Sequence, residues 1–125
     1  MVAVAHATEL ARLFGATLHV VSVDKPMARS AAARVPLDDL TEDARNALRR
    51  GADPARAAGV RVETHALIGA PAHMLVELAE KLHADVIVVG NRGMVGSRRF
   101  LGSVPNAVAH HAPCSVLIVE TQRHA

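Results

Sequence analysis

The chain has no tryptophan or tyrosine and only two phenylalanines among its 125 residues. Proteins that hold single-stranded nucleic acid stack its bases on aromatic side chains, and this sequence offers almost none. The net charge is only +2, and the charged residues are scattered rather than gathered into a basic stripe. We therefore expect no nucleic-acid partner.

Cysteine is almost absent as well. A single residue, Cys114, excludes an internal disulfide and any metal site built from several thiolates. No apolar run reaches the ~18 residues of a membrane span, and residues 1–11 lack the charged and apolar regions of a signal peptide. These features predict a reduced, cytoplasmic protein without a membrane partner.

The hydrophobic residues, half of the chain, fall into alternating helix-like and strand-like segments. Strands separated by helices predict right-handed crossovers and a mostly parallel sheet covered on both faces. The sequence thus predicts one α/β domain over residues 1–125, with three layers (α/β/α) and four strands. Helices are expected over 4–14, from Asp38 or Asp39 to about Ala58, and over 72–83 and 103–111; strands are expected over 17–23, 61–68, 85–89 and 115–119.

Two places interrupt this pattern. Residues 24–36 contain two prolines among alanine and arginine, and they are predicted to form a mobile loop. Pro54 lies inside the second helix, where it has no N–H to donate, so we expect that it can break that helix near Asp53. At the end of the first helix, Gly15 is a candidate C-cap.

The most informative segment is 85–103. An apolar run ends at Gly90, a loop rich in glycine and arginine follows, and a helix begins at Gly102-Ser103. Glycines let a backbone approach phosphate oxygens, and the first N–H groups of a helix point at them. The segment lacks both the Lys-Ser/Thr of a P-loop and the glycine spacing of a dinucleotide fingerprint. It predicts a phosphate site at the carboxyl end of a parallel strand.

The motif Gly90-x2-Gly93, followed by Gly102-Ser103 and residues 104–119, resembles the ATP-binding members of the universal stress protein (UspA) family. Eight residues separate Gly93 from Gly102, where the family pattern has nine. The resemblance also covers residues 9–23 and the turn at 69–71. It implies a UspA-like fold of the adenine nucleotide alpha hydrolase type. It also implies a regulatory stress-response module that binds ATP, with Mg²⁺, and signals through nucleotide occupancy and dimer contacts.

The resemblance also implies the roles of individual residues. The first two glycines approach ribose and phosphate, the Gly-Ser pair receives the β- and γ-phosphates, a strand-end backbone reads adenine, and arginines pair with phosphates. Plainer roles stay open for each: turn glycines, a helix cap, core packing and solvated arginines. The implied cofactor-binding residues are Val23, Gly90, Gly93, Arg98, Arg99, Gly102, Ser103 and Val104.

One part of the family pattern has no counterpart here. The family fold opens with a hydrophobic strand in the middle of a five-stranded sheet, followed by an acidic residue that contacts the nucleoside. This sequence begins inside the expected first helix. We therefore expect either a start further upstream or an incomplete site, with strands 17–23 and 85–89 on either side of the missing strand.

The family also implies a homodimer in which the last strand, 115–119, pairs across the two-fold axis, together with an unidentified regulatory protein partner. Pairing would cover an apolar edge strand. The alternative is a dimeric protein-interaction module of the same fold that binds no nucleotide. An ATPase is a further alternative, but no residue is evident that could orient water, and no catalytic residue is assigned.

The histidines and the thiol add no recognisable pattern. The chain has eight histidines, but His19, His65 and most others fall on separate elements, and no His-x3-His pair occurs. No metal site is expected on this basis. Cys114 has no evident activating partner and is expected to be a buried, unreactive thiol.

Overall fold

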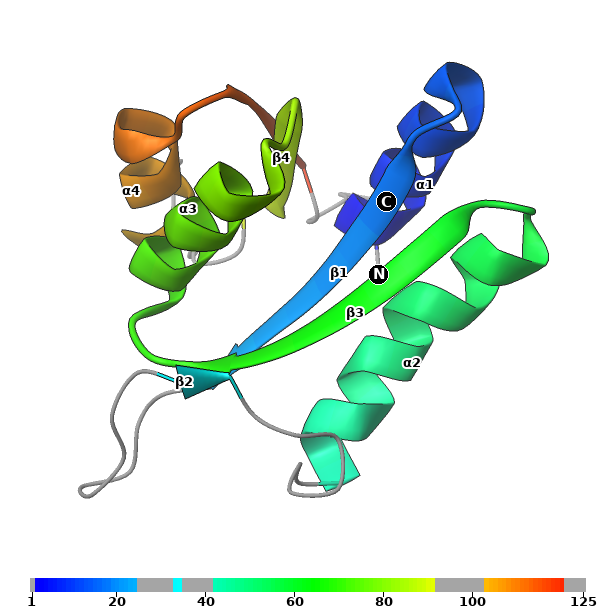
Figure 1. The fold of residues 1–125 in the computed structure, drawn as a ribbon, viewed down its shortest axis with the longest axis horizontal. Coiled ribbons are helices and arrows are strands. Elements are labelled where there is room, and N and C mark those ends of the chain that lie inside the picture. The colour runs from blue at the N-terminus through cyan, green and yellow to red at the C-terminus, as the bar shows by residue number, and fades with distance from the viewer. Residues whose placement is uncertain (1, 25–32, 35–41, 92–102, 121–125) are drawn as a thin grey trace.

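The computed structural model describes residues 2–24, 33–34, 42–91 and 103–120. Helices and strands alternate through this part of the chain, which confirms the α/β class (Figure 1). The elements are α1 (Val2–Phe14), β1 (Thr17–Asp24), β2 (Ala33–Arg34), α2 (Glu42–Ala57), β3 (Arg61–Ile68), α3 (Pro71–Leu82), β4 (Val86–Gly90), α4 (Ser103–His111) and β5 (Ser115–Val119).

The strands form two sheets within the described residues. The first has the order β1-β3-β2, and the second pairs β4 with β5. Both long pairings are parallel: Thr17 lies opposite Arg61 in the first sheet and Val86 lies opposite Ser115 in the second. In the described part of the chain, β1 and β4 each have one edge without a neighbouring strand. The sequence predicts a single mostly parallel sheet, whereas the described strands form two sheets, each built on one parallel pair, and no described strand pairing joins them.

The sequence predicts a loop over residues 24–36, and this is wrong at Ala33–Arg34. These two residues form β2, which runs antiparallel to β3 opposite Leu67 and Ile68. The described chain therefore has five strands rather than the four expected. A two-residue strand leaves no hydrophobic periodicity to detect, because its pairing depends on the edge that β3 offers.

Pro54 does not break α2, which continues to Ala57. The backbone N–H of Ala58 donates to the Pro54 carbonyl at 3.0 Å, so helical bonding resumes after the proline. Ala55 is 0% exposed and packs against Ala11 and Val60. Burial of this last turn outweighs one lost hydrogen bond at an exposed residue. The predicted helix start at Asp38 or Asp39 lies outside the described residues.

Left-handed residues end three of the elements. Gly15 follows α1 with a φ of 65°, as its predicted role as C-cap requires. Gly59 has a φ of 87° after α2. His83 caps α3 with a φ of 52°, and its N–H points at the carbonyls of Ala79 and Glu80. These turns direct the chain from each helix into the following strand.

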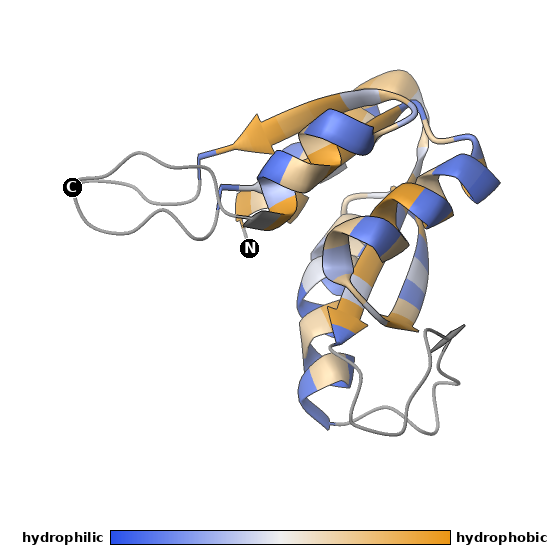
Figure 2. Ribbon diagram, turned by 90° about the vertical axis from the view of Figure 1, so that its left-hand side faces the viewer, coloured by the Kyte–Doolittle hydropathy of each residue, from blue (hydrophilic) through white to orange (hydrophobic). Residues whose placement is uncertain are grey.

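The helices cover the sheets from different sides. α2 packs on β1 and β3 through Leu48, which lies against Val20 and Ala66. α1 packs beside it through Ala11, which lies against Ala55 of α2 and Leu18 of β1. α3 and α4 pack together beside β4 and β5 around Ile87 and Val108. α1 contacts both sheets and so links them. Figure 2 shows hydrophobic and hydrophilic bands alternating along the helices, as these one-sided contacts require.

Among the described helices, none has the length and apolar character needed to cross a membrane.

Candidate functional site

The carboxyl end of β4 is held firmly by β5. Gly90 lies opposite Val119, and the Asn91 backbone N–H donates to the Val119 carbonyl at 3.0 Å. The Asn91 side chain is buried, with the residue 5% exposed, and its Nδ2 donates to Oε1 of Glu120 at 3.1 Å. These bonds fix where the chain leaves the sheet.

Sequence reasoning missed Asn91. The available signal was a polar residue directly after an apolar strand, at the point where the glycine-rich segment begins. A buried amide needs hydrogen-bond partners. The sequence does not indicate that Glu120 is the partner of Asn91, because Glu120 lies 29 residues away. Only the β4–β5 pairing brings the two side chains together.

α4 begins at Ser103, as predicted. Val104 is partly buried against the cluster that contains Ala79, Ile87 and Val108. Pro105 has no N–H, so the first turn offers the backbone donors of Ser103, Val104 and Asn106. The side chain of Val104 thus serves packing, while its backbone N–H lies in the turn from which a helix binds anions.

Val23 lies near the end of β1, opposite Leu67, and is partly buried. The neighbouring carbonyl of Asp24 accepts a hydrogen bond from the Gly69 N–H at 2.9 Å, which closes the end of this sheet. Val23 and Gly90 therefore belong to different sheets in the described chain. α1 contacts both β1 and β4 and so relates the two sheets. α3 does the same, because it contacts β1 and β3 and its Ala79 packs with Ile87 of β4.

Four of the predicted site residues lie outside the described residues: Gly93, Arg98, Arg99 and Gly102. Their contacts with phosphate stay predictions. The described part of the site is its frame, namely the end of β4 and the first turn of α4.

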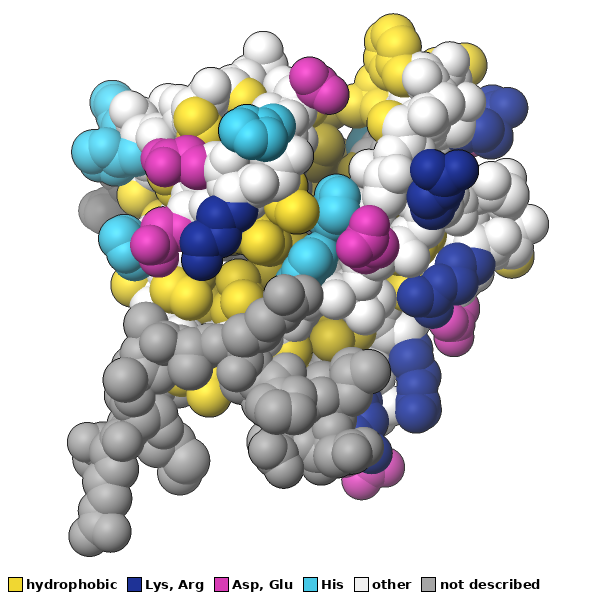
Figure 3. Space-filling model, in the orientation of Figure 1, with side chains coloured by type: hydrophobic (Ala, Val, Ile, Leu, Met, Phe, Trp, Pro, Cys, Tyr) yellow, Lys and Arg dark blue, Asp and Glu magenta, His cyan; other side chains and the backbone are white. Residues whose placement is uncertain are grey.

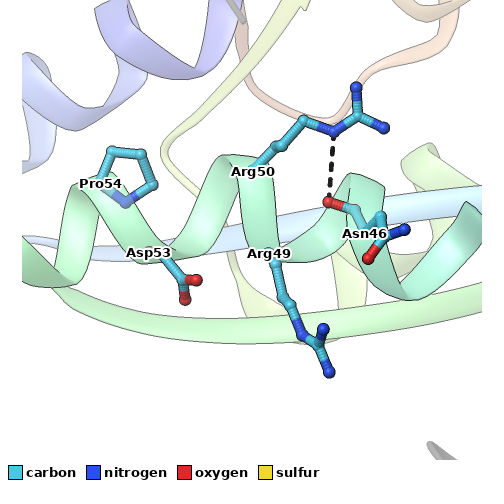
Figure 4. Close-up of a pocket in the computed structure, with 5 residues that line it drawn as sticks. All are labelled: Asn46, Arg49, Arg50, Asp53 and Pro54. Carbon is cyan, nitrogen blue, oxygen red and sulfur yellow. Dashed lines mark hydrogen bonds between the residues drawn. The ribbon is translucent and has the colours of Figure 1, made fainter.

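A shallow hollow on α2 is a poor candidate for the site. Its lining consists of Asn46, Arg49, Arg50, Asp53 and Pro54, all from one helix (Figure 4). The Arg50 Nε donates to the Asn46 carbonyl at 3.4 Å, so one donor of this guanidinium is already used by the backbone of the same helix. A surface between side chains of a single helix does not enclose a ligand.

Cys114 packs beside Ile87 and is partly buried. Burial raises the pKa of the thiol, the negative charge of Asp85 acts in the same direction, and a backbone hydrogen bond from Ile87 opposes them. A raised pKa lowers the thiolate fraction, which supports the expectation of an unreactive thiol.

Comparison with known proteins identifies the family. The model of the universal stress protein family matches residues 1–120. The chain belongs to this family. Universal stress protein A homolog 1 of Coxiella burnetii is 38% identical over 120 residues, covering 90% of this chain and 82% of the relative.

Solved universal stress proteins have the same fold. One, determined in complex with cAMP, is 34% identical with a TM-score of 0.77, covering 96% of this chain and 88% of that one. Another, from Archaeoglobus fulgidus in complex with dAMP, is 25% identical with a TM-score of 0.74, covering 95% and 86%. The family and the α/β fold inferred from the sequence are thereby confirmed.

Proposed function

We propose that this universal stress protein binds an adenine nucleotide, ATP with Mg²⁺, and acts as a regulatory module that responds to nucleotide occupancy. The similar structures bound to cAMP and dAMP support the adenine nucleotide class, because both ligands combine adenine with a phosphate. ATP in particular rests on the glycine motif and its Gly-Ser helix start.

The observation that carries the proposal is the frame around residues 91–103. The chain leaves β4 at Asn91, which is tied to Val119 and Glu120, and it re-enters regular structure at Ser103. Val104 and Val108 of α4 pack against the same cluster as Ile87 of β4. Both ends of the glycine-rich segment thus lie on packed elements, which is how a phosphate-binding loop is held in position.

Calorimetric titration with ATP and AMP tests the proposal. ATP should bind more tightly than AMP, since the recognisable part of the motif addresses phosphates. Gly102→Val should block close approach of a phosphate and weaken ATP binding at least about tenfold, or about 1.4 kcal/mol. Ala57→Val, at an exposed position of α2, is the matched control and should leave binding unchanged.

Ser103→Ala should have a smaller effect on ATP affinity than Gly102→Val, because it keeps the backbone N–H at the start of α4. Chelation of Mg²⁺ should weaken ATP binding more than AMP binding. Equal ATP affinity for wild type and Gly102→Val would show that the motif is only a turn. Binding of neither nucleotide would favour the alternative, an interaction module without nucleotide.

We further propose that the protein forms a homodimer through β5 and that a regulatory protein binds this dimer. Among the described strands, β5 pairs only with β4, which leaves its other edge without a strand. Leu117 of β5 is 38% exposed and Val86 of β4 is 44% exposed, so this sheet also presents apolar side chains. A second copy would cover them. Light scattering measures the assembly directly.

A further inference from the structure

Three potential metal ligands meet on the first sheet. His19 comes from β1, and Glu63 and His65 come from β3. The parallel register places His19 opposite Glu63, and His65 lies two residues further along β3, on the same face. Figure 3 shows histidine and acidic side chains side by side over these two strands.

The two imidazoles are already in contact. Nδ1 of His19 and Nε2 of His65 lie 2.9 Å apart, and the ring centroids are 5.1 Å apart with a tilt of 34°. The ligand atoms of all three residues, including a Glu63 carboxylate oxygen, lie within 4.8 Å of one another. His65 is 4% exposed, His19 is partly buried and Glu63 is exposed. The cluster therefore has a buried base and an open side.

These distances suit a metal ion. With metal–nitrogen bonds of about 2.0–2.1 Å, tetrahedral geometry separates two nitrogens by about 3.3 Å, and a right angle separates them by about 2.9 Å. The observed pair needs to open by only a few tenths of an ångström at most. The Glu63 side chain is exposed, so its carboxylate has the freedom to close on an ion.

We propose that His19, Glu63 and His65 bind a divalent transition-metal ion of the Zn²⁺ class. Two imidazoles and one carboxylate are donors that Zn²⁺ accepts, whereas Mg²⁺ and Ca²⁺ prefer oxygen ligands alone. Three protein ligands leave a fourth position for water. The two facing nitrogens offer their lone pairs when each ring carries its proton on the other nitrogen.

This site is separate from the nucleotide site. His19 precedes Val23 by four residues along β1, or about 13 Å at the usual rise of a strand. Spacing along the chain gave no signal, because the two histidines are 46 positions apart. The ion would join β1 to β3, so its binding should stabilise the fold.

Zinc titration of the full chain tests the proposal, with competition against a chromophoric chelator as the readout. Wild type should bind one tightly held ion. Mutating a residue that only hydrogen-bonds to a metal ligand lowers metal affinity about 10–100-fold. Removal of a ligand itself, by His19→Gln or Glu63→Gln, should therefore lower zinc affinity at least about tenfold. His73→Gln is the matched control: His73 Nε2 lies 3.1 Å from Oε2 of Glu77 on the exposed face of α3. It removes another histidine–carboxylate pair and should leave affinity unchanged.

Two further measurements, of thermal stability and of Co²⁺ absorption, complete the test. Zn²⁺ should raise the Tm of wild type and His73→Gln but not of His19→Gln, and Co²⁺ should give a visible absorption band that Glu63→Gln alters. Glu63 is exposed, so this variant keeps the test valid if a histidine variant fails to fold. Undiminished binding in both ligand variants, or no uptake by wild type at stoichiometric Zn²⁺, would overturn the proposal and leave a hydrogen-bonded histidine pair.

Discussion

The contact between α2 and β1 depends on the absence of a side chain at Gly51. A Cβ at this position would lie 2.9 Å from Cγ1 of Val20 and 3.5 Å from Cγ2 of Val4. The first distance is shorter than carbon atoms tolerate, so Val20 would have to move. Val20 is buried among Ala44, Leu48 and Ala66, and valine has little freedom at χ1. We therefore expect Gly51→Ala to strain this contact.

Two opposing effects determine the magnitude. Alanine in place of glycine favours a helix by about 1 kcal/mol. Overpacking a core costs about 1–3 kcal/mol. The net loss in the free energy of unfolding for Gly51→Ala should therefore lie between about 0 and 2 kcal/mol. When Val20→Ala first removes the opposing methyl groups, Gly51→Ala should instead stabilise the protein by up to about 1 kcal/mol.

Urea denaturation of the wild type, both single variants and the double variant, followed by circular dichroism, gives the coupling free energy. We expect a coupling of about 1–3 kcal/mol, the cost of overpacking. Gly15→Ala is the control: its φ of 65° makes alanine strained, but no atom lies within 4 Å of its Cβ position. Its cost should be the same with Val20 or Ala at position 20. A stabilising Gly51→Ala with equal effect in both backgrounds would refute the reasoning.

Three further outcomes are expected. Val108 is 0% exposed, so Val108→Ala should lower the free energy of unfolding by roughly 2 kcal/mol, measured by denaturation. Because burial raises the pKa of Cys114, its reaction with a disulfide reagent at about pH 8 should be slower in the folded chain than in the denatured chain. The midpoint of its pH–rate profile should also be higher; identical profiles would contradict this. Ile118→Pro removes a backbone N–H from β5, and light scattering should show a monomer or an unfolded chain; an unchanged dimer would place the interface elsewhere.

Much of the secondary structure follows from local sequence. The strands Arg61–Ile68 and Ser115–Val119 and the helix Ser103–His111 have the bounds that the sequence predicts. The turn at Gly15 could also be predicted, because a left-handed position after a helix favours glycine. Hydrophobic periodicity and turn chemistry are properties of neighbouring residues, so they can be read along the chain. The glycine motif of the family can be recognised in the sequence for the same reason, since its glycines lie close together along the chain.

Tertiary structure decided the features that depend on distant residues. α2 continues past Pro54 because Ala55 is buried against α1 and the start of β3, and β2 exists because β3 offers an edge. Asn91 is satisfied by Glu120 only once β4 and β5 pair. His19 and His65 carry no shared pattern in sequence, yet the β1–β3 register brings their ring nitrogens into contact. Pairing and packing join residues across long separations, and no local pattern encodes which partners will meet.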